Sequence, residues 1–200
     1  MKRITIIAAV VAALALASTA AAALVPGVFD PDKTGCPVST YSHGVLHLEK
    51  NCAQDVNAAA GADITGVAGQ TFTSASFTLA STSQCQGGSP RFNVSTTVPT
   101  TPQPFFLGCN NVTPTINGDG TATYTFNSST LPASMFPTGT ITGVQIVLDI
   151  PGTADLTNIT FNGMREVPVP GANKHHKLKH PCPHNRTRDH DCGLHKGKGH

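Results

Sequence analysis

Hydrophobic and polar residues alternate one by one in short segments through the middle of this 200-residue chain. A period of two places successive side chains on opposite faces of an extended chain, which is typical of a half-buried β-strand. No window shows the 3.6-residue spacing of an amphipathic helix. The pattern marks eight short segments: 45–50, 64–67, 75–79, 92–94, 105–107, 122–126, 144–150 and 157–161.

Turn-forming runs separate these segments, among them Gly87-Gly88-Ser89-Pro90 and Asn117-Gly118-Asp119-Gly120. Eight short strands without intervening helices predict an all-β fold, an antiparallel β-sandwich of the jelly-roll kind. We expect four parts along the chain: a signal peptide (1–23), an N-terminal extension (24–40), the sandwich (41–164) and a disordered tail (165–200).

The N-terminus has the three regions of a secretory signal. Lys2 and Arg3 precede an apolar, alanine-rich stretch over 4–16, and the small residues of 18–23 suit cleavage after Ala22 or Ala23. The apolar run is shorter than a membrane span requires, and Pro26 follows soon after it. We therefore expect an extracellular protein, secreted or held at the cell wall, with no membrane span after cleavage.

Export to an oxidising compartment makes disulfides the expected state of the six cysteines. Six cysteines allow fifteen connectivities, and the sequence alone does not choose among them. Local spacing favours pairs that bracket turn-rich segments: Cys36 with Cys52, Cys85 with Cys109, and Cys182 with Cys192.

Charge divides the chain near residue 165. Segment 165–200 holds eight Lys or Arg against three acids, a net charge of +5, whereas 24–164 holds three against eight, a net charge of −5. The tail is rich in Pro, Gly, Lys and His without periodicity, which predicts disorder. Its positive charge favours anionic wall polymers as partners. We expect no specific nucleic-acid partner.

The tail also carries metal-binding chemistry. Cys182 and His184 mirror His190 and Cys192 across a five-residue loop, and imidazole with thiolate suits Zn²⁺, while histidine alone also suits Cu²⁺ or Ni²⁺. Because oxidation would join the two cysteines, histidines are the expected ligands of a transition metal. The candidates are His175, His176, His180, His184 and His190. The alternative is an unstructured cationic tail without a specific site, and we expect no other cofactor.

Three motifs carry a resemblance to known proteins. Segments 86–94, 105–109 and 156–163 resemble a group of uncharacterised secreted bacterial proteins of actinobacterial type, over roughly residues 46–163. The last segment is also similar to the closing strand of jelly-roll carbohydrate-binding modules, although Thr157 stands where that pattern has an acid. The resemblance implies a sandwich fold and an extracytoplasmic location.

Three residues of the body are candidates for ligand binding. Arg91 has outward parity on its strand and could meet a carboxylate, a sulfate or a sugar hydroxyl; the alternatives are an ion pair with Asp149 or Asp63, or simple exposure to solvent. Phe105 and Phe106 could provide an aromatic platform for a sugar ring, or belong to the core.

Two further patterns in the body suggest metal ligands. His43, His47 and Glu49 share the parity of one strand face and could chelate a metal, or form a solvated polar face. Asp30 and Asp32 imitate the opening of a calcium loop, but Tyr41 stands at the twelfth position, where such a loop needs Glu.

No nucleophile elbow, zinc-protease helix or phosphate-binding loop is present in the sequence. We therefore expect a non-catalytic secreted sandwich that is associated with the envelope or binds a ligand, a glycan or wall polymer. The alternative function is extracellular binding of Zn, Cu or Ni through the tail.

Overall fold

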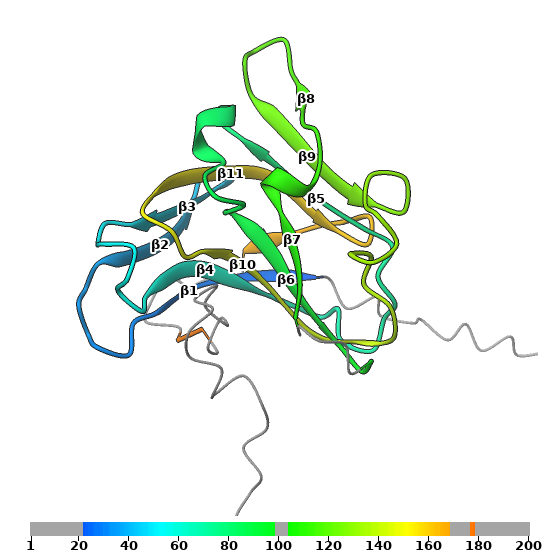
Figure 1. The fold of residues 1–200 in the computed structure, drawn as a ribbon, viewed down its shortest axis with the longest axis horizontal. Helices are drawn as coiled ribbons and strands as arrows, with labels where there is room; N and C mark the ends of the chain where they lie inside the picture. The colour runs from blue at the N-terminus through cyan, green and yellow to red at the C-terminus, as the bar shows by residue number, and fades with distance from the viewer. Residues whose placement is uncertain (1–21, 99–103, 169–176, 179–200) are drawn as a thin grey trace, which may run out of the picture.

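The computed structural model of the chain describes residues 22–98, 104–168 and 177–178, and these form two β-sheets packed face to face (Figure 1). Sheet A contains β1 (Ala23–Phe29), β4 (Ala59–Thr65), β6 (Arg91–Thr96), β7 (Phe105–Gly108), β10 (Ile141–Leu148) and β13 (Val167–Pro168). Sheet B contains β2 (Pro37–Ser42), β3 (Val45–Lys50), β5 (Ser74–Leu79), β8 (Thr115–Ile116), β9 (Ala122–Asn127), β11 (Gly152–Phe161) and β12 (Met164–Arg165). Two 3₁₀ turns, η1 (Thr82–Gln84) and η2 (Cys109–Asn111), complete the described elements.

The strand order confirms the predicted jelly-roll sandwich. Sheet A runs β13-β1-β4-β10-β6-β7, and sheet B runs β2-β3-β11-β5-β9-β8. The inner strands β4-β10-β6-β7 and β3-β11-β5-β9 form the two four-stranded layers of a jelly roll. Each of these eight strands overlaps one of the eight predicted segments, but β4 shares only residues 64–65 with segment 64–67 and β11 begins five residues before segment 157–161.

Two strands lie where we expected only an N-terminal extension. β1 pairs with β4 along its whole length although it contains Pro26, which has no N–H for a ladder hydrogen bond. Its other neighbour, β13, pairs only with Ala23 and Leu24, so the missing N–H lies on an open stretch of the edge. The second strand, β2, pairs with β3 and forms one edge of sheet B.

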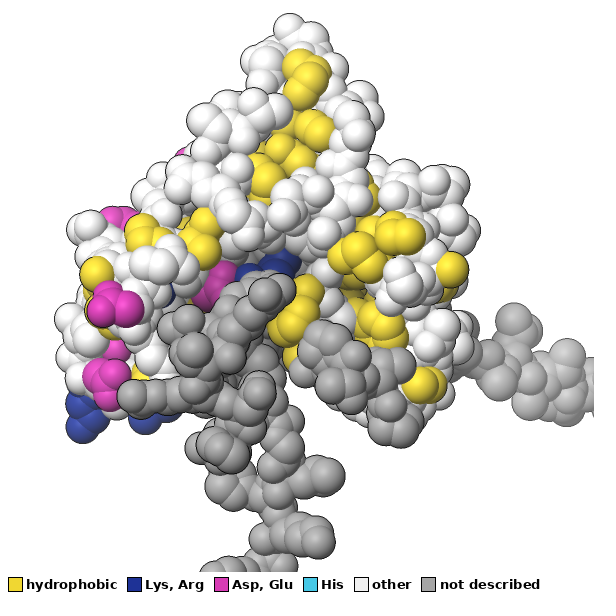
Figure 2. Space-filling model, in the orientation of Figure 1, with side chains coloured by type: hydrophobic (Ala, Val, Ile, Leu, Met, Phe, Trp, Pro, Cys, Tyr) yellow, Lys and Arg dark blue, Asp and Glu magenta, His cyan; other side chains and the backbone are white. Residues whose placement is uncertain are grey.

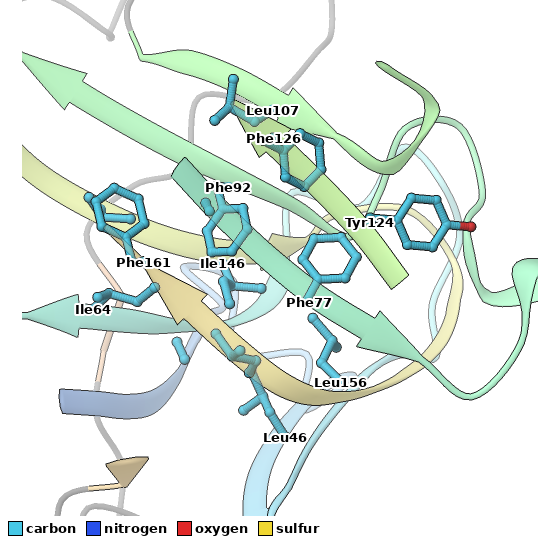
Figure 3. Packing of buried hydrophobic residues seen from close by; sticks show 14 of the residues in the cluster. Leu46, Ile64, Phe77, Phe92, Leu107, Tyr124, Phe126, Ile146, Leu156 and Phe161 are labelled. Carbon is cyan, nitrogen blue, oxygen red and sulfur yellow. The ribbon is translucent and has the colours of Figure 1, made fainter. Parts of the chain in front are cut away.

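The core between the sheets is built around aromatic rings (Figure 3). Phe77 of β5 is fully buried, and its ring centroid lies 5.5 Å from those of Phe92 and Tyr124 and 5.7 Å from that of Phe126. These rings come from both sheets, so the packing joins the layers. Burying an aromatic side chain contributes roughly 1.5–3 kcal/mol.

Two disulfides hold the described part of the chain, and both confirm predicted pairs. Cys36–Cys52 joins the residue before β2 to the loop after β3. Cys85–Cys109 joins the loop after β5, in sheet B, to the end of β7, in sheet A. Each closes a loop whose cross-link is worth about 3 kcal/mol in the chain-entropy model. The Cys182–Cys192 pair lies outside the described residues.

Contacts with the sandwich continue beyond residue 165, where we expected the tail to begin. Val167 and Pro168 of β13 pair in parallel with the start of β1. Farther along, Lys177 forms a parallel bridge with Val28, near the end of β1. Both contacts lie on the same edge of sheet A.

Candidate functional site

Arg91 lies at the start of β6 on the outer face of sheet A, as its parity predicts, but it is buried rather than exposed, with 2% of its side chain accessible. Its two terminal nitrogens donate to the two carboxylate oxygens of Asp149, each at 2.6 Å. Its Nε donates to Asn93 Oδ1 at 2.9 Å. The ion pair with Asp149 is the alternative that the sequence analysis left open for this residue.

The two candidate phenylalanines point to opposite sides of β7. Phe105 packs against the core, whereas Phe106 lies under Arg91, whose guanidinium carbon is 4.9 Å from the ring centroid. A cation over an aromatic face gains further electrostatic attraction. The structure therefore brings Arg91 and Phe106 together as a closed internal cluster, and it separates Phe105 from them.

A second buried cation, Lys50, also contacts Asp149. The Lys50 ammonium donates to the backbone carbonyls of Val56 and Asp149, both at 2.9 Å, and is 2% exposed. Desolvation lowers the pKa of Lys50, and the charges of Asp149 and Asp55 oppose that change. Asp149 thus joins two buried cations, one through its carboxylate and one through its carbonyl.

These contacts change the charge that the body presents to solvent. Of its three cations only Lys33 remains exposed, and of its eight acids only Asp149 is taken up by the buried cluster. The accessible balance of residues 24–164 is therefore one cation against seven acids, a net charge of −6. On the face seen in Figure 2, few charged side chains appear among the described residues.

The outer face of sheet B is lined with hydroxyl side chains in register, which we call the hydroxyl rows. The first row crosses four strands and contains Thr157, Thr78, Thr123 and Thr115. The second row crosses three strands and contains Thr160, Ser76 and Thr125. Neighbouring strands are about 4.8 Å apart, so the hydroxyls of each row follow one another at that repeat. Thr78, in the middle of the first row, is itself buried, at 5% exposure.

Some hydroxyls in the rows already bond one another. Ser76 Oγ lies 2.7 Å from Thr160 Oγ1, and Thr78 Oγ1 lies 2.9 Å from Thr123 Oγ1. Thr125 is exposed. Thr123 Oγ1 also accepts from Asn117 Nδ2 at 3.0 Å. Because a hydroxyl has one donor and two acceptor positions, acceptor capacity for a ligand remains mainly at the Ser76–Thr160 pair and at Thr125.

At the end of this face, three polar side chains surround His47. Its Nδ1 lies 2.7 Å from Asp155 Oδ1, and its Nε2 lies 3.7 Å from Glu49 Oε2. Gln84 Nε2 donates to the other oxygen of Asp155 at 3.4 Å. The side chains of His47 and Asp155 are 37% and 41% exposed, so this cluster is open to solvent.

The geometry of His47 does not match the chelate that the sequence suggested. The two carboxylates approach different ring nitrogens, and the described residues contain no group of three His, Cys, Asp or Glu placed to hold a metal. His43 instead lies in the β2–β3 turn with a φ of 50°.

The Asp30 loop is held by its own side chain. The Asp30 carboxylate accepts hydrogen bonds from the backbone N–H groups of Thr34 and Gly35 and from the Thr34 hydroxyl, at 2.8–2.9 Å. Desolvation raises the pKa of Asp30, but these hydrogen bonds outweigh it and the net shift is downward. The Asp30 carboxylate therefore caps this turn.

The candidate metal ligands of the tail lie outside the described residues: His175, His176, His180, His184 and His190. Within the described part, one shallow hollow of about 230 Å³ adjoins the first disulfide and is lined by Glu49, Lys50, Asn51, Cys52, Pro151, Gly152 and Thr153.

Comparison with known proteins adds no relative: no family model matches the chain, and neither a curated protein nor a solved structure matches it. The structure itself therefore defines the class, a disulfide-linked jelly-roll sandwich. Disulfides suit an oxidising compartment. No helix among the described residues is long and apolar enough to cross a membrane.

Proposed function

We propose that this chain is a non-catalytic, secreted binding protein of the cell envelope, and that the outer face of sheet B binds a neutral, hydroxyl-rich glycan. The hydroxyl rows carry the proposal. A sugar ring presents hydroxyls that donate and accept, and hydroxyls on neighbouring strands offer the complementary groups at a regular repeat.

The charge of the body favours a neutral ligand. With one exposed cation against seven acids, the sandwich repels polymers rich in phosphate or carboxylate. Arg91, the residue suited to an anion, is occupied by Asp149. An anionic wall polymer would therefore meet the cationic tail rather than the sandwich.

The polar cluster around His47 supports binding rather than catalysis. Asp155 accepts from Gln84 and pairs with His47, and its backbone N–H donates to Gln84 Oε1 at 3.2 Å. A carboxylate held by this many partners is oriented for hydrogen bonding. The role fits a residue that fixes the edge of a binding face.

A titration of the full chain with a panel of wall polymers tests the proposal, with neutral glycan fragments in one arm and phosphate-containing polymers in the other. The paired change Ser76→Ala and Thr125→Val removes two hydroxyls from the second row. Each hydrogen bond is worth about 1 kcal/mol, so affinity for a neutral glycan should fall about tenfold or more.

Thr65→Val is the matched control, because Thr65 is an exposed threonine on sheet A and its loss should leave glycan affinity unchanged. Equal affinity of the paired variant and the wild type would remove the hydroxyl rows from the binding site. Binding confined to the phosphate-containing polymers would refute a neutral ligand.

A further inference from the structure

Two glycines lie side by side on the outer face of sheet A. Gly27 of β1 is in register with Gly61 of β4, and Gly61 is in register with Val147 of β10. The core residues alternate with these positions, so this row faces away from sheet B. Glycine within a strand often marks the close approach of another segment, because no side chain stands in the way. The pair leaves a hollow in the sheet surface.

Leu178 from the tail fills this hollow. Its side chain is 4% exposed, and a Cβ added to Gly61 would lie 2.9 Å from Leu178 Cδ1. The same Cβ would meet the backbone oxygen of Ile146, so only glycine fits at this position. Val147, next in the row, is fully buried.

Backbone pairing places the leucine. The N–H of Leu178 donates to the carbonyl of Val28 at 3.1 Å, and Lys177 forms a parallel bridge with the same residue. The neighbouring Lys177 side chain is exposed, as the alternation of an extended strand requires. Residues 177–178, orange in Figure 1, thus lie on the edge of β1 as a short added strand.

Two separate stretches of the β1 edge pair with the C-terminal part of the chain, and Pro26 lies between them. β13 covers Ala23 and Leu24 in parallel, and the Lys177 bridge covers Val28 in the same direction. Pro26 lies between them and has no N–H to offer. The chain therefore pairs with β1 on both sides of the proline.

The opposite net charges of the sandwich and the tail also favour Lys177–Leu178 as the segment that occupies this hollow. Residues 24–164 carry a net charge of −5, whereas 165–200 carries +5. Opposite net charges draw the tail toward the body and raise the local concentration of Lys177–Leu178 near the groove.

We propose that the outer face of sheet A holds a docking groove for an extended Lys-Leu segment, and that Lys177–Leu178 of the same chain is its resident occupant. Leu178 is the anchor, and Gly27 and Gly61 form the hollow that receives its side chain. The Val28 carbonyl, which accepts the Leu178 N–H, orients the segment parallel to β1. The anchor holds the basic tail at the sheet opposite the hydroxyl rows. This inference does not depend on the proposed glycan function.

Proteolysis of the full chain tests the anchor. Trypsin cleavage after Lys177 should be slow in the wild type, with cleavage after Arg186 as the internal reference. Leu178→Ala should raise the relative rate after Lys177 at least tenfold, because it removes most of the buried side chain. Leu194→Ala, which shortens the tail's other leucine, should leave the ratio unchanged. Equal ratios in the wild type and Leu178→Ala would overturn the proposal.

A peptide in trans tests the groove. A labelled peptide spanning residues 172–181 should bind the Leu178→Ala chain at least tenfold more tightly than the wild type, whose groove is occupied. The same peptide with alanine for leucine should bind neither chain. Equal binding of the first peptide to both chains would contradict an occupied groove. Protection of Lys177 that rises with protein concentration would show that a second copy supplies the leucine, and would refute an occupant from the same chain.

Discussion

The outer faces of the two sheets differ in how far their outward-facing side chains reach solvent. On sheet A, outward residues such as Arg91 and Val147 are buried. On sheet B, outward residues form the hydroxyl rows and the open cluster around His47. Both faces belong to one jelly roll with one core. A strand's alternation therefore shows which residues face away from the core, but not which of those residues reach solvent.

Two side-chain pairs make the comparison quantitative, the Arg91–Asp149 ion pair and the His47–Asp155 hydrogen bond. Arg91–Asp149 on sheet A and His47–Asp155 on sheet B have nearly equal N···O distances, 2.6 Å and 2.7 Å. Their side chains differ in exposure, at 2% and 12% in the first pair and 37% and 41% in the second. Solvent screens an exposed pair, whereas removing one partner of a buried pair leaves a charge without compensation. Removing one partner should therefore lower the free energy of unfolding more for the buried pair than for the exposed pair, although their N···O distances are nearly equal.

The largest expected effect is that of Asp149→Ala. It leaves Arg91 buried without its carboxylate, which should lower the free energy of unfolding by about 3–5 kcal/mol in urea denaturation. The double change Arg91→Met with Asp149→Leu removes both charges and should recover most of the loss. A single variant as stable as the wild type would show that the pair contributes little.

Glu166 tests what a buried charge does without a partner. It is 4% exposed, and neither carboxylate oxygen has a hydrogen-bond partner among the residues that the structure describes. Desolvation raises the pKa of Glu166 from 4.5 to about 7. At 1.36 kcal/mol per pKa unit, ionisation in the folded state costs up to about 3 kcal/mol.

The sign follows from proton binding. Between pH 4.5 and 7 the folded state holds the Glu166 proton and the unfolded state releases it, so stability falls as pH rises through this window. Glu166→Gln should therefore stabilise the protein by up to about 3 kcal/mol at pH 8 relative to its effect at pH 4. Denaturation at several pH values measures this. A pH-independent difference would mean that Glu166 titrates normally.

The smallest expected effect is that of Asp155→Ala on sheet B. Its partners are exposed, so the free energy of unfolding should change by less than about 1 kcal/mol. Urea denaturation under the conditions used for Asp149→Ala provides the direct contrast. A loss comparable to that of Asp149→Ala would remove the distinction between the faces.

The sequence predicts the jelly roll well because seven of its eight strands contain an alternating segment; β4, with the sequence AAGADIT, does not alternate and is predicted only at its end. It does not predict β1, because Pro26 and Gly27 argue against a strand until the edge position and the neighbouring Gly61 are known. It suggests the pairs Cys36–Cys52 and Cys85–Cys109 through local spacing.

The hydroxyl rows and the Arg91 cluster depend on the register between strands that are distant in sequence. The alternation within one strand carries no information about that register. Thr123 has visible outward parity, but Thr157 shares the sequence parity of the buried Ile159 and Phe161. Only the register shift between Thr157 and Thr160 places Thr157 beside Thr78 on the outer face. Arg91 has the predicted parity as well, and its burial depends on Phe106 and Asp149 from two other segments.

Mapping of glycan contacts by NMR on the isotope-labelled full chain tests the central claim, that sheet B is the binding face and sheet A is closed. Addition of a neutral wall glycan should shift amide and methyl signals of the hydroxyl rows, with Thr125 and Thr157 among the largest, and leave Gly61, Val147 and Leu178 unmoved. Shifts concentrated on Gly61, Val147 and Leu178, with the hydroxyl rows silent, would contradict the account.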